Sequence, residues 1–368
     1  MRGVFVVPGS LGHLHPQAAL AQALLVRGHE VTLVTTDDRV AAAQALGFDV
    51  VSVGPPAGSE FPGPITFLVD DDAIGELERV VGDRGADFIV HDHVGASAAL
   101  VGRDAGIPAI YVGVGTVRPP EMVSGVDSAL RAHCSRTGRT PLPDGGLYST
   151  LHLSRCPPSL QPSGFSALPN TVSVQPFSHD GVPGGAHSPG WLDAYRAPTT
   201  VYVTLGSWGA QPDALELLAP MVSALARLDA EVIVTVGSGG PISELQSLVP
   251  GVRVEGYVPQ KFVMDVADLV VCHGGSGAIL GALSAATPVV AAPQGADHFW
   301  NCELLVARGA GLALGSGGIP DPEELTRVVD SALASDGLRA SAAELAQEIA
   351  QLPDLAMATD LILATATS

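Results

Sequence analysis

The sequence predicts an α/β protein built from two parallel-sheet domains in series. Its 368 residues are too many for one ordinary domain and suit two of roughly 150–200 residues each. Apolar residues make up 46% of the chain, enough for two cores. Short runs rich in valine and isoleucine alternate with longer helical patterns, and this alternation is typical of βαβ units.

The first half of the chain carries five predicted strands and four predicted helices. Each strand is nearly continuous in apolar residues, as expected when helices cover both faces of a parallel sheet. The strands are predicted at residues 3–7, 30–35, 49–53, 88–91 and 109–112, and the helices at 15–27, 38–46, 72–81 and 95–104.

A segment rich in glycine, proline, serine and histidine, residues 179–198, is the predicted linker. It separates a first domain of residues 1–178 from a second of residues 199–353, and the final helix, 354–368, is assigned to the first domain. The second domain repeats the α/β pattern, with strands at 201–205, 231–236, 252–255, 269–272 and 289–292 and helices at 212–228, 261–265, 276–285 and 300–307.

Charge and composition exclude several classes of function. Lysine and arginine total 18 against 38 aspartate and glutamate, a formal net charge of −20, so neither nucleic acid nor an anionic membrane is an expected partner. The sequence has a single lysine, Lys261, and that lysine is not part of a P-loop motif, so a P-loop is excluded. Four cysteines without a C-x-x-C motif and no apolar run of about 18 residues predict a cytoplasmic protein with reduced thiols. A homodimer is compatible with this composition.

Histidines follow the first predicted strand, where an open α/β sheet binds ligands. The turn contains Gly12, His13, His15 and Pro16, and from position alone either histidine could be a base or a structural helix cap. A second polar group, His91-Asp92-His93, ends the strand at 88–91.

Strand alternation predicts that Asp92 points away from His91 and His93. A carboxylate there could orient a histidine of the first turn and stabilise its imidazolium form. As a metal site, the two flanking histidines lack a third ligand at suitable local spacing, so no metal is predicted.

The most specific motif is in the second half. The apolar strand at 269–272 ends in His273, and the glycine-rich turn after it opens a helix. Such a turn lets backbone amides and the helix dipole bind a diphosphate. Asp297, His298 and Asn301 follow the next strand and reach the same edge of the sheet.

Four motifs in this order, G-H-x-x-P, V-P-Q, H-G-G-x-G and P-x-x-x-D-x-x-x-N, resemble the UDP/dTDP-sugar-dependent glycosyltransferases of the GT-B fold. The bacterial branch that glycosylates antibiotics and other natural products fits best, and the resemblance covers nearly the whole chain. It implies two Rossmann-like domains facing each other across a cleft, with the acceptor on the first and the nucleotide sugar on the second. It also implies a hexosyltransferase whose partners are a small-molecule acceptor and a nucleotide sugar.

The resemblance implies a role for each matching residue. His13, not His15, is the base, and Asp92 orients it. The donor phosphates, nucleobase and sugar are then bound by Gly206, Ser207, Tyr257, Val258, Gln260, His273, Gly275, Ser276, Gly277, Ala278, Asp297 and His298. The acceptor site is expected to be open, with Gly12, His15, Phe61 and Phe67 as candidate contacts.

Two departures from the family pattern favour a dTDP-deoxysugar. The family often has glutamine where this chain has His298. This difference leaves the identity of the donor sugar undetermined. UDP-dependent relatives commonly place a ribose-binding glutamate where this chain has Gly281, and deoxyribose lacks the 2′-hydroxyl that such a carboxylate would hold. The predicted reaction is an inverting single displacement that needs no cofactor or metal.

Other interpretations remain open at this point. Asp70-Asp71-Asp72 resembles a D-x-D metal motif, although an acidic N-cap for the helix at 72–81 explains it more simply. A sugar-nucleotide epimerase of the same fold would release nucleotide and free sugar without an acceptor. A non-catalytic activator of a partner glycosyltransferase would be expected to lose the base or diphosphate motif, and both are intact. The interpretation as a nicotinamide-dependent enzyme rests only on short glycine-containing segments that do not complete a dinucleotide-binding motif.

Overall fold

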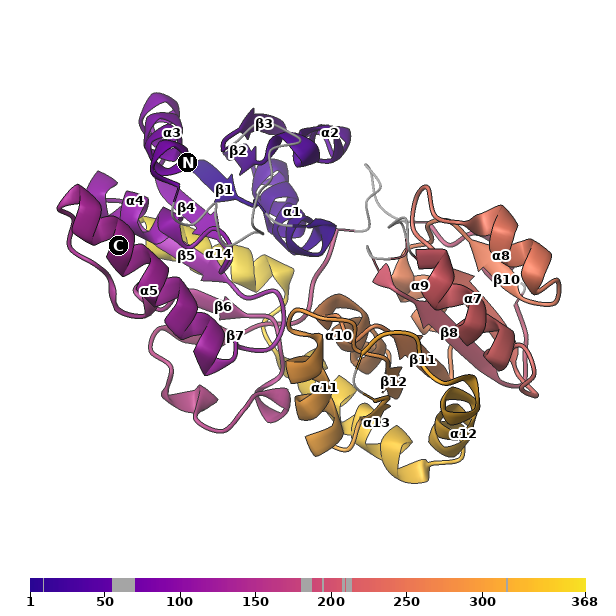
Figure 1. Ribbon diagram of the computed structural model, residues 1–368. Helices are drawn as coiled ribbons and strands as arrows, with labels where there is room; N and C mark the ends of the chain where they lie inside the picture. The colour runs from indigo at the N-terminus through magenta and orange to yellow at the C-terminus, as the bar shows by residue number, and fades with distance from the viewer. Residues whose placement is uncertain are drawn as a thin grey trace. The chain divides into compact units, whose positions relative to one another are not determined.

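The computed structural model describes residues 1–8, 10–54, 70–179, 187–193, 195–206, 209, 214–315 and 317–368. The chain divides into two compact units, each a parallel sheet with helices on it (Figure 1). The first unit comprises Met1–Pro158, Ser163–Gly184 and Leu352–Ser368, and the second comprises Ser159–Pro162 and Gly185–Gln351. The predicted pair of parallel-sheet α/β domains is thus confirmed, although the prediction did not place Ser159–Pro162 with the second unit.

The described part of the first unit forms a seven-stranded sheet in the order β3-β2-β1-β4-β5-β6-β7, and every neighbouring pair is parallel. The strand order reverses between β1 and β4, and ligands of such sheets bind at this switch point. The strands are β1 (Arg2–Val6), β2 (Glu30–Thr35), β3 (Asp49–Ser52), β4 (Phe88–His91), β5 (Ala109–Val112), β6 (His152–Ser154) and β7 (Thr171–Ser173).

Helices cover both faces of this sheet because alternate side chains of each strand are apolar in both directions. On β1, Phe5 packs into a core with α1 and α14, whereas Val4 and Val6 pack into a core with α3 and α4. The helices of this unit are α1 (Leu11–Val26), α2 (Asp37–Ala45), α3 (Asp71–Arg84), α4 (Ser97–Ala105), α5 (Pro120–Thr137) and α14 (Leu355–Ala366).

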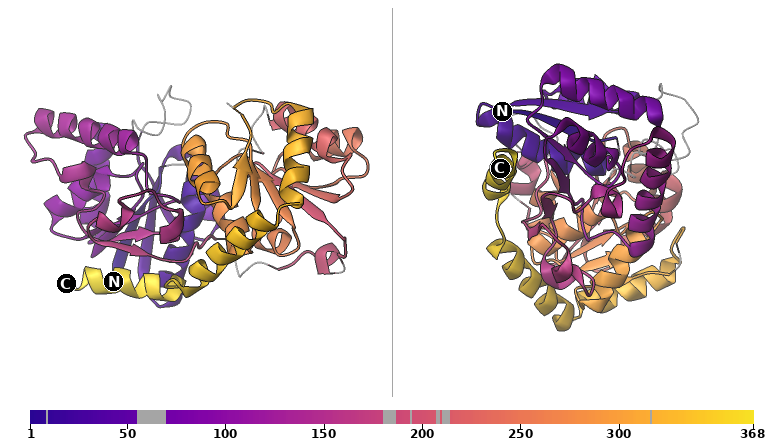
Figure 2. Two further views of the ribbon diagram at one scale, coloured as in Figure 1. Left: turned by 90° about the horizontal axis from the view of Figure 1, so that it is seen from below. Right: turned by 90° about the vertical axis from the view of Figure 1, so that its left-hand side faces the viewer.

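The C-terminal helix α14 belongs to the first unit although it is last in the chain. Asp354 caps its start by accepting a hydrogen bond from the Met357 amide at 2.9 Å. Arg27, just after α1, pairs with Asp360 at 2.5 Å and donates to the Ala356 carbonyl. Figure 2 shows α14, in yellow, running alongside the indigo elements of this unit.

The second unit repeats the topology. Its described residues form a six-stranded parallel sheet in the order β10-β9-β8-β11-β12-β13, with the switch point between β8 and β11. The strands are β8 (Thr200–Thr204), β9 (Glu231–Thr235), β10 (Arg253–Glu255), β11 (Leu269–Cys272), β12 (Val289–Ala291) and β13 (Gly311–Ala313). The helices are α6 (Gly190–Asp193), α7 (Ala214–Leu225), α8 (Ile242–Leu248), α9 (Gln260–Met264), α10 (Ser276–Ser284), α11 (His298–Ala307), α12 (Pro322–Leu333) and α13 (Asp336–Gln351).

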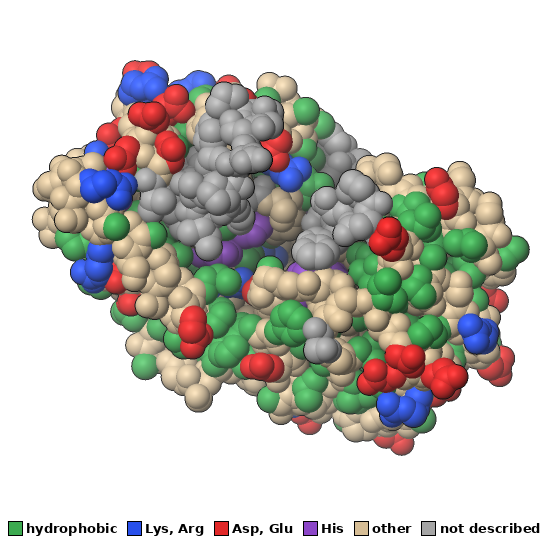
Figure 3. All heavy atoms as spheres, viewed as in Figure 1, with side chains coloured by type: hydrophobic (Ala, Val, Ile, Leu, Met, Phe, Trp, Pro, Cys, Tyr) green, Lys and Arg blue, Asp and Glu red, His purple; other side chains and the backbone are tan. Residues whose placement is uncertain are grey.

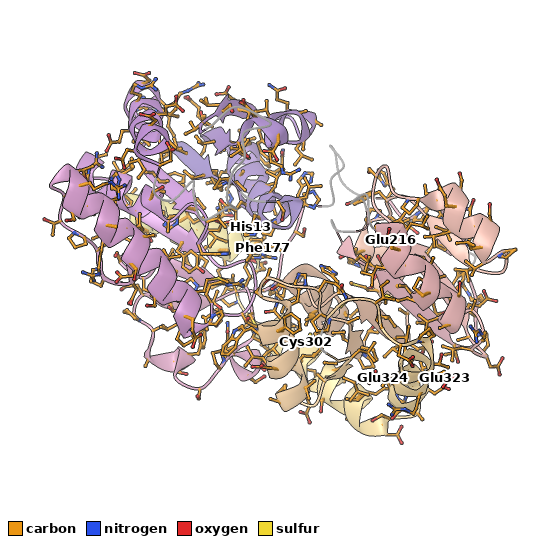
Figure 4. The ribbon with its side chains drawn as sticks, viewed as in Figure 1. His13, Phe177, Glu216, Cys302, Glu323 and Glu324 are labelled. Carbon is orange, nitrogen blue, oxygen red and sulfur yellow. The ribbon has the colours of Figure 1, made fainter. Side chains whose placement is uncertain are left out.

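Several short elements were not predicted. Strands β6, β7 and β13 have three residues each, too few to show a period, and helices α5, α8 and α12 were also missed. The signal for α12 was present: Asp321 caps it, Pro322 opens it, and the first turn contains Glu323 and Glu324 (Figure 4).

Part of the predicted linker is structured. The short helix α6 lies within residues 179–198 and belongs to the second unit. The Arg253 guanidinium lies 4.3 Å from the centre of the Trp191 ring, a cation–π contact that attaches α6 to β10. The linker prediction was therefore too long at its C-terminal end.

Charge and helix length bear on possible partners. Acidic side chains outnumber basic ones over the face seen in Figure 3, in keeping with the net charge of −20. Among the described helices, no single one is long and apolar enough to cross a membrane. The pair α13 and α14, bent by 45° at the break between them, meets the criterion only when taken together, by length and composition.

Candidate active site

His13 and Asp92 meet at the switch point of the first sheet. The parallel register pairs Val6 with His91, so the loops that follow β1 and β4 start side by side. His13 lies in the first turn of α1 (Figure 4), and its Nδ1 donates to Asp92 Oδ2 at 2.6 Å. The structure pairs Asp92 with His13, 79 residues away in the chain.

Asp92 is a fully buried carboxylate whose two oxygens are both hydrogen-bonded. Oδ1 accepts from the amides of Val94 at 2.8 Å and Gly95 at 3.1 Å, while Oδ2 accepts from His13. Burial by itself would raise the pKa of Asp92, but the charge and hydrogen bond of His13, the charge of His93 and the Gly95 amide outweigh it and lower that pKa. Asp92 is therefore ionised at neutral pH, and His13, whose side chain is 20% exposed, remains open to solvent.

His93 lies beside this pair, which corrects the expectation from strand alternation. The rings of His13 and His93 have centroids 5.2 Å apart. His91 alone points the other way, where its Nδ1 donates to the Asp92 carbonyl at 2.9 Å and its ring stacks on Tyr111. The alternation fails because β4 ends at His91, so Asp92 and His93 are already in the loop.

The remaining acceptor candidates are only partly described. Gly12 is exposed, and His15 is half-buried with its carbonyl accepting from the His179 amide at 3.0 Å. Burial, then the charge of His179, lowers the pKa of His15 to about 4. Phe61 and Phe67 lie outside the described residues.

The acidic run before α3 is a helix start. Asp70, not Asp72, is the N-cap, because its side chain accepts from the Ala73 amide at 2.8 Å. Asp71 accepts from His133 at 2.7 Å and from Arg136 at 2.9 Å, which ties α3 to α5. Asp70 is therefore a helix cap, and Asp71 pairs with basic side chains of the neighbouring helix.

Gly206 and His273 occupy the corresponding switch point of the second sheet, after β8 and β11. Gly206 has φ +55°, and a Cβ there would lie 3.1 Å from His273 Cε1, so a side chain at this position would be both strained and crowded. Ser207, the next predicted donor contact, lies outside the described residues.

His273 is a buried, neutral histidine. Burial and then the charge of His298 lower its pKa to about 3. The His298 ring meets it edge-on with centroids 4.7 Å apart, and His298 Nδ1 accepts from the Gln294 amide at 3.4 Å. Burial likewise lowers the pKa of His298. Both imidazoles can therefore donate hydrogen bonds at neutral pH but carry no charge.

The start of α10 has the properties of an anion site. Gly275 is its N-cap and offers no side chain, and the first turn contains no acidic residue. The first-turn amides, which belong to Ser276, Gly277 and Ala278, have no partners within the helix. Their N–H groups and the helix dipole favour a negatively charged group at this end.

Gly281 has a packing role within the second unit. A Cβ at this position would lie 2.7 Å from the sulfur of Met264, a buried residue at the end of α9. Met264 therefore fills the space that a side chain at 281 would need. Because this sulfur lies near the end of a flexible side chain, Met264 could shift, and the contact alone does not require glycine at this position.

The remaining donor candidates follow β10. Tyr257 is 42% exposed, the only exposed tyrosine of the five, all of which are described. Val258 is buried. The Gln260 side chain donates to Thr204 Oγ1 at 3.3 Å, and this hydroxyl also accepts from the Gly206 amide. Gln260 thus contacts the last residue of β8.

Asn301 is a functional candidate that the sequence analysis quoted but did not assign. It is buried on α11, and its Nδ2 donates to Gly274 O at 3.1 Å, Ser276 Oγ at 3.1 Å and Asp297 Oδ2 at 3.2 Å. It therefore joins the glycine-rich turn to the loop that carries Asp297. Its spacing of four residues from Asp297, one helical turn, was the available signal.

Replacing Asn301 with leucine, which has a similar volume, is expected to leave these three acceptors without their donor. The free energy of unfolding should fall by about 1–3 kcal/mol, the usual cost of an unsatisfied buried polar group. Donor affinity should fall as well, because Asp297 and the turn lose their connection. Chemical denaturation and donor titration measure the two effects. An unchanged donor affinity would show that Asn301 acts on stability alone.

Comparisons with known proteins find that the chain is similar to glycosyltransferases of antibiotic biosynthesis. Residues 219–362 match the family model described as "Erythromycin biosynthesis protein CIII-like, C-terminal domain". The elloramycin glycosyltransferase of Streptomyces olivaceus is 29% identical, covering 96% of this chain and 94% of its own. The crystal structure of the glycosyltransferase SnogD from Streptomyces nogalater superimposes with a TM-score of 0.78 at 28% identity, over 100% and 99% of the two chains. Spinosyn rhamnosyltransferase SpnG complexed with thymidine diphosphate gives a TM-score of 0.79 at 23% identity, over 99% of both chains.

Proposed function

We propose that this chain, which belongs to the natural-product glycosyltransferases of the GT-B fold, transfers a deoxysugar from a dTDP donor to a hydroxyl group of a small acceptor, with inversion. The observation that carries the proposal is the hydrogen bond between His13 and the buried carboxylate of Asp92. An ionised Asp92 is the partner that a general base of this kind requires.

The base step follows from the tautomer of His13. Its Nδ1 donates to Asp92, so the proton of the neutral ring is on Nδ1 and the lone pair is on Nε2. Nε2 takes the proton of the acceptor hydroxyl while that oxygen attacks the anomeric carbon. The bond from the anomeric carbon to the diphosphate oxygen breaks, and dTDP leaves from the opposite face. Asp92 stabilises the imidazolium that forms.

The second unit binds the donor in this proposal. The diphosphate lies at the start of α10, where the amides of Ser276, Gly277 and Ala278 donate to it together with the neutral imidazole of His273. These groups stabilise the negative charge that develops on the leaving diphosphate. The step needs no cofactor and no metal, because the developing charge is met by fixed hydrogen-bond donors.

The rest of the donor is held by side chains around the same sheet edge. Tyr257 stacks on the nucleobase with its exposed ring, and Val258 and Gln260 contact the donor next to it. Asp297 binds sugar hydroxyls, with Asn301 holding it in place, and His298 takes the place of the family's glutamine. The remaining proposed donor contacts are Gly206, Ser207 and Gly275.

The acceptor belongs to the first unit, close to His13, with Gly12 and His15 as contacts. The preference for thymidine is supported by SpnG, a relative in fold that was solved with thymidine diphosphate. Gly281, at the position where UDP-dependent relatives commonly have a ribose-binding glutamate, supports it as well.

Thermal unfolding in the presence of dTDP, UDP or GDP tests which nucleotide the sugar donor carries. We expect dTDP to raise the melting temperature most, because a ligand that binds only the native state stabilises it, by about 2.7 kcal/mol at a hundredfold excess over Kd. Donor turnover with dTDP- and UDP-sugars is the companion measurement. A larger shift with UDP would contradict the dTDP assignment but leave the transfer reaction standing.

A further inference from the structure

His13, Asp92 and His93 form a group that no step of the proposed reaction uses as a whole. Among the described residues, these three offer nitrogen and oxygen atoms that all lie within 4.8 Å of one another. His13 comes from α1 and the other two from the loop after β4, so local sequence spacing could not reveal the set. Of the H-x-H pair only His93 belongs to this set, and His13 of α1 and Asp92 supply the other two ligands.

The donor set suits a particular class of cation. Two imidazoles and one carboxylate are typical ligands of Zn²⁺ and neighbouring divalent transition metals, whereas Mg²⁺ and Ca²⁺ prefer oxygen ligands. Zinc bonds of about 2.0–2.2 Å bring tetrahedral ligands to about 3.4 Å from one another, so the three residues must close by about 1.4 Å at most. His13, in the first helical turn and partly exposed, is the residue most free to move.

The surroundings of Asp92 are those of a metal-binding carboxylate. Its Oδ1 is held by the amides of Val94 and Gly95, and such outer hydrogen bonds orient a ligating group. Its Oδ2 faces His13, where a cation would replace the hydrogen-bonded proton. Asp92 is buried, and among the described residues His13 and His93 are the charged groups that act on it, so a divalent cation there gains more than it would at the surface.

We propose that His13, Asp92 and His93 bind a divalent transition-metal ion such as Zn²⁺, and that the bound ion inhibits transfer. The inhibition rests on the proposed role of His13 as the base. If the ion binds Nε2, the lone pair that accepts the proton is occupied. If it binds Nδ1, the ring proton must sit on Nε2, which again cannot accept. Either way, the ion and proton abstraction exclude each other.

The test measures binding and activity separately, with Zn²⁺ alone as the probe in a non-chelating buffer. Isothermal titration calorimetry should show one site per chain, and transfer should fall with the same half-saturating zinc concentration and recover with EDTA. His93→Ala should weaken zinc binding at least tenfold, and the transfer that this variant retains should need at least tenfold more zinc for half-inhibition. His187→Ala, at an exposed histidine elsewhere, is the matched control and should leave zinc binding unchanged.

Each other outcome has a defined meaning. Equal zinc affinity in wild type, His93→Ala and His187→Ala would overturn the site. A His93-dependent site whose occupation leaves transfer unchanged would keep the site but refute the inhibition and count against His13 as the base. If His93→Ala unfolds at the assay temperature, His93→Gln, which keeps a polar side chain, takes its place and must show the same loss of zinc binding.

Discussion

Replacing His13 with alanine is expected to lower the turnover rate for sugar transfer by about 10²–10⁴-fold, the usual contribution of a general base. The acceptor hydroxyl then has no group to take its proton as it attacks. The affinity for dTDP should stay the same, since the proposed nucleotide contacts are all in the second unit. Steady-state kinetics at saturating donor, together with dTDP titration, separate the two quantities.

Two histidine variants make this result specific. His187→Ala removes an exposed imidazole elsewhere and should keep full activity. His15→Ala removes the competing histidine of the same turn, whose pKa of about 4 reflects burial and His179. It should change acceptor KM more than turnover. A His13→Ala variant with wild-type turnover, or a His15→Ala variant with the larger loss, would move the base to another residue.

The fold was predictable where elements are long and apolar. Strands β1, β2, β4 and β11 and helices α1 and α10 carry uninterrupted patterns and were placed within a few residues. Strands β6, β7 and β13 were not predicted, although the equally short strands β10 and β12 were. Helix α6 was not predicted either, and it is fixed by the contact of Trp191 with Arg253.

The site was predictable to the extent that motifs encode it. The pairing of His13 with Asp92 was expected from matching motifs. In the structure, His13 Nδ1 lies 2.6 Å from Asp92 Oδ2. The position of His93 was predicted wrongly, because alternation was extended past the end of β4. The contact between Gly281 and Met264 could not be inferred, since it depends on how α9 packs on α10.

The two units use the same topological position for different chemistry. In each sheet the order reverses beside the first strand of the unit, and the loops after the two central strands meet there. The first sheet places a histidine and an ionised carboxylate at this point, which suits proton transfer. The second places glycine, a neutral histidine and a helix start, which suits a diphosphate. The proposed assignment of the acceptor to the first unit and the donor to the second thus rests on the chemistry of each unit taken separately.

Asp92→Asn is expected to lower turnover by about 10²–10⁴-fold as well, through His13. The asparagine oxygen can still accept from Val94 and Gly95, so its NH₂ group faces His13 Nδ1. That nitrogen must then accept, the ring proton moves to Nε2, and the base is lost. The donor KM should not change, and Asp336→Asn, at an exposed aspartate, is the matched control. Turnover within twofold of wild type would refute the positioning role.

The same variant gives a pH-dependent signature in stability, which a residue with an unshifted pKa would not give. The folded-state pKa of Asp92 is lowered, so its ionised form stabilises the native state. That stabilisation is complete above the unfolded aspartate pKa of about 3.9 and is lost as the pH falls through the lower folded value. The difference in unfolding free energy between wild type and Asp92→Asn should therefore be constant above about pH 5 and shrink below about pH 4. Denaturation at pH 7 and pH 3 measures it, and a difference that grows on acidification would mean that the buried carboxylate is held protonated.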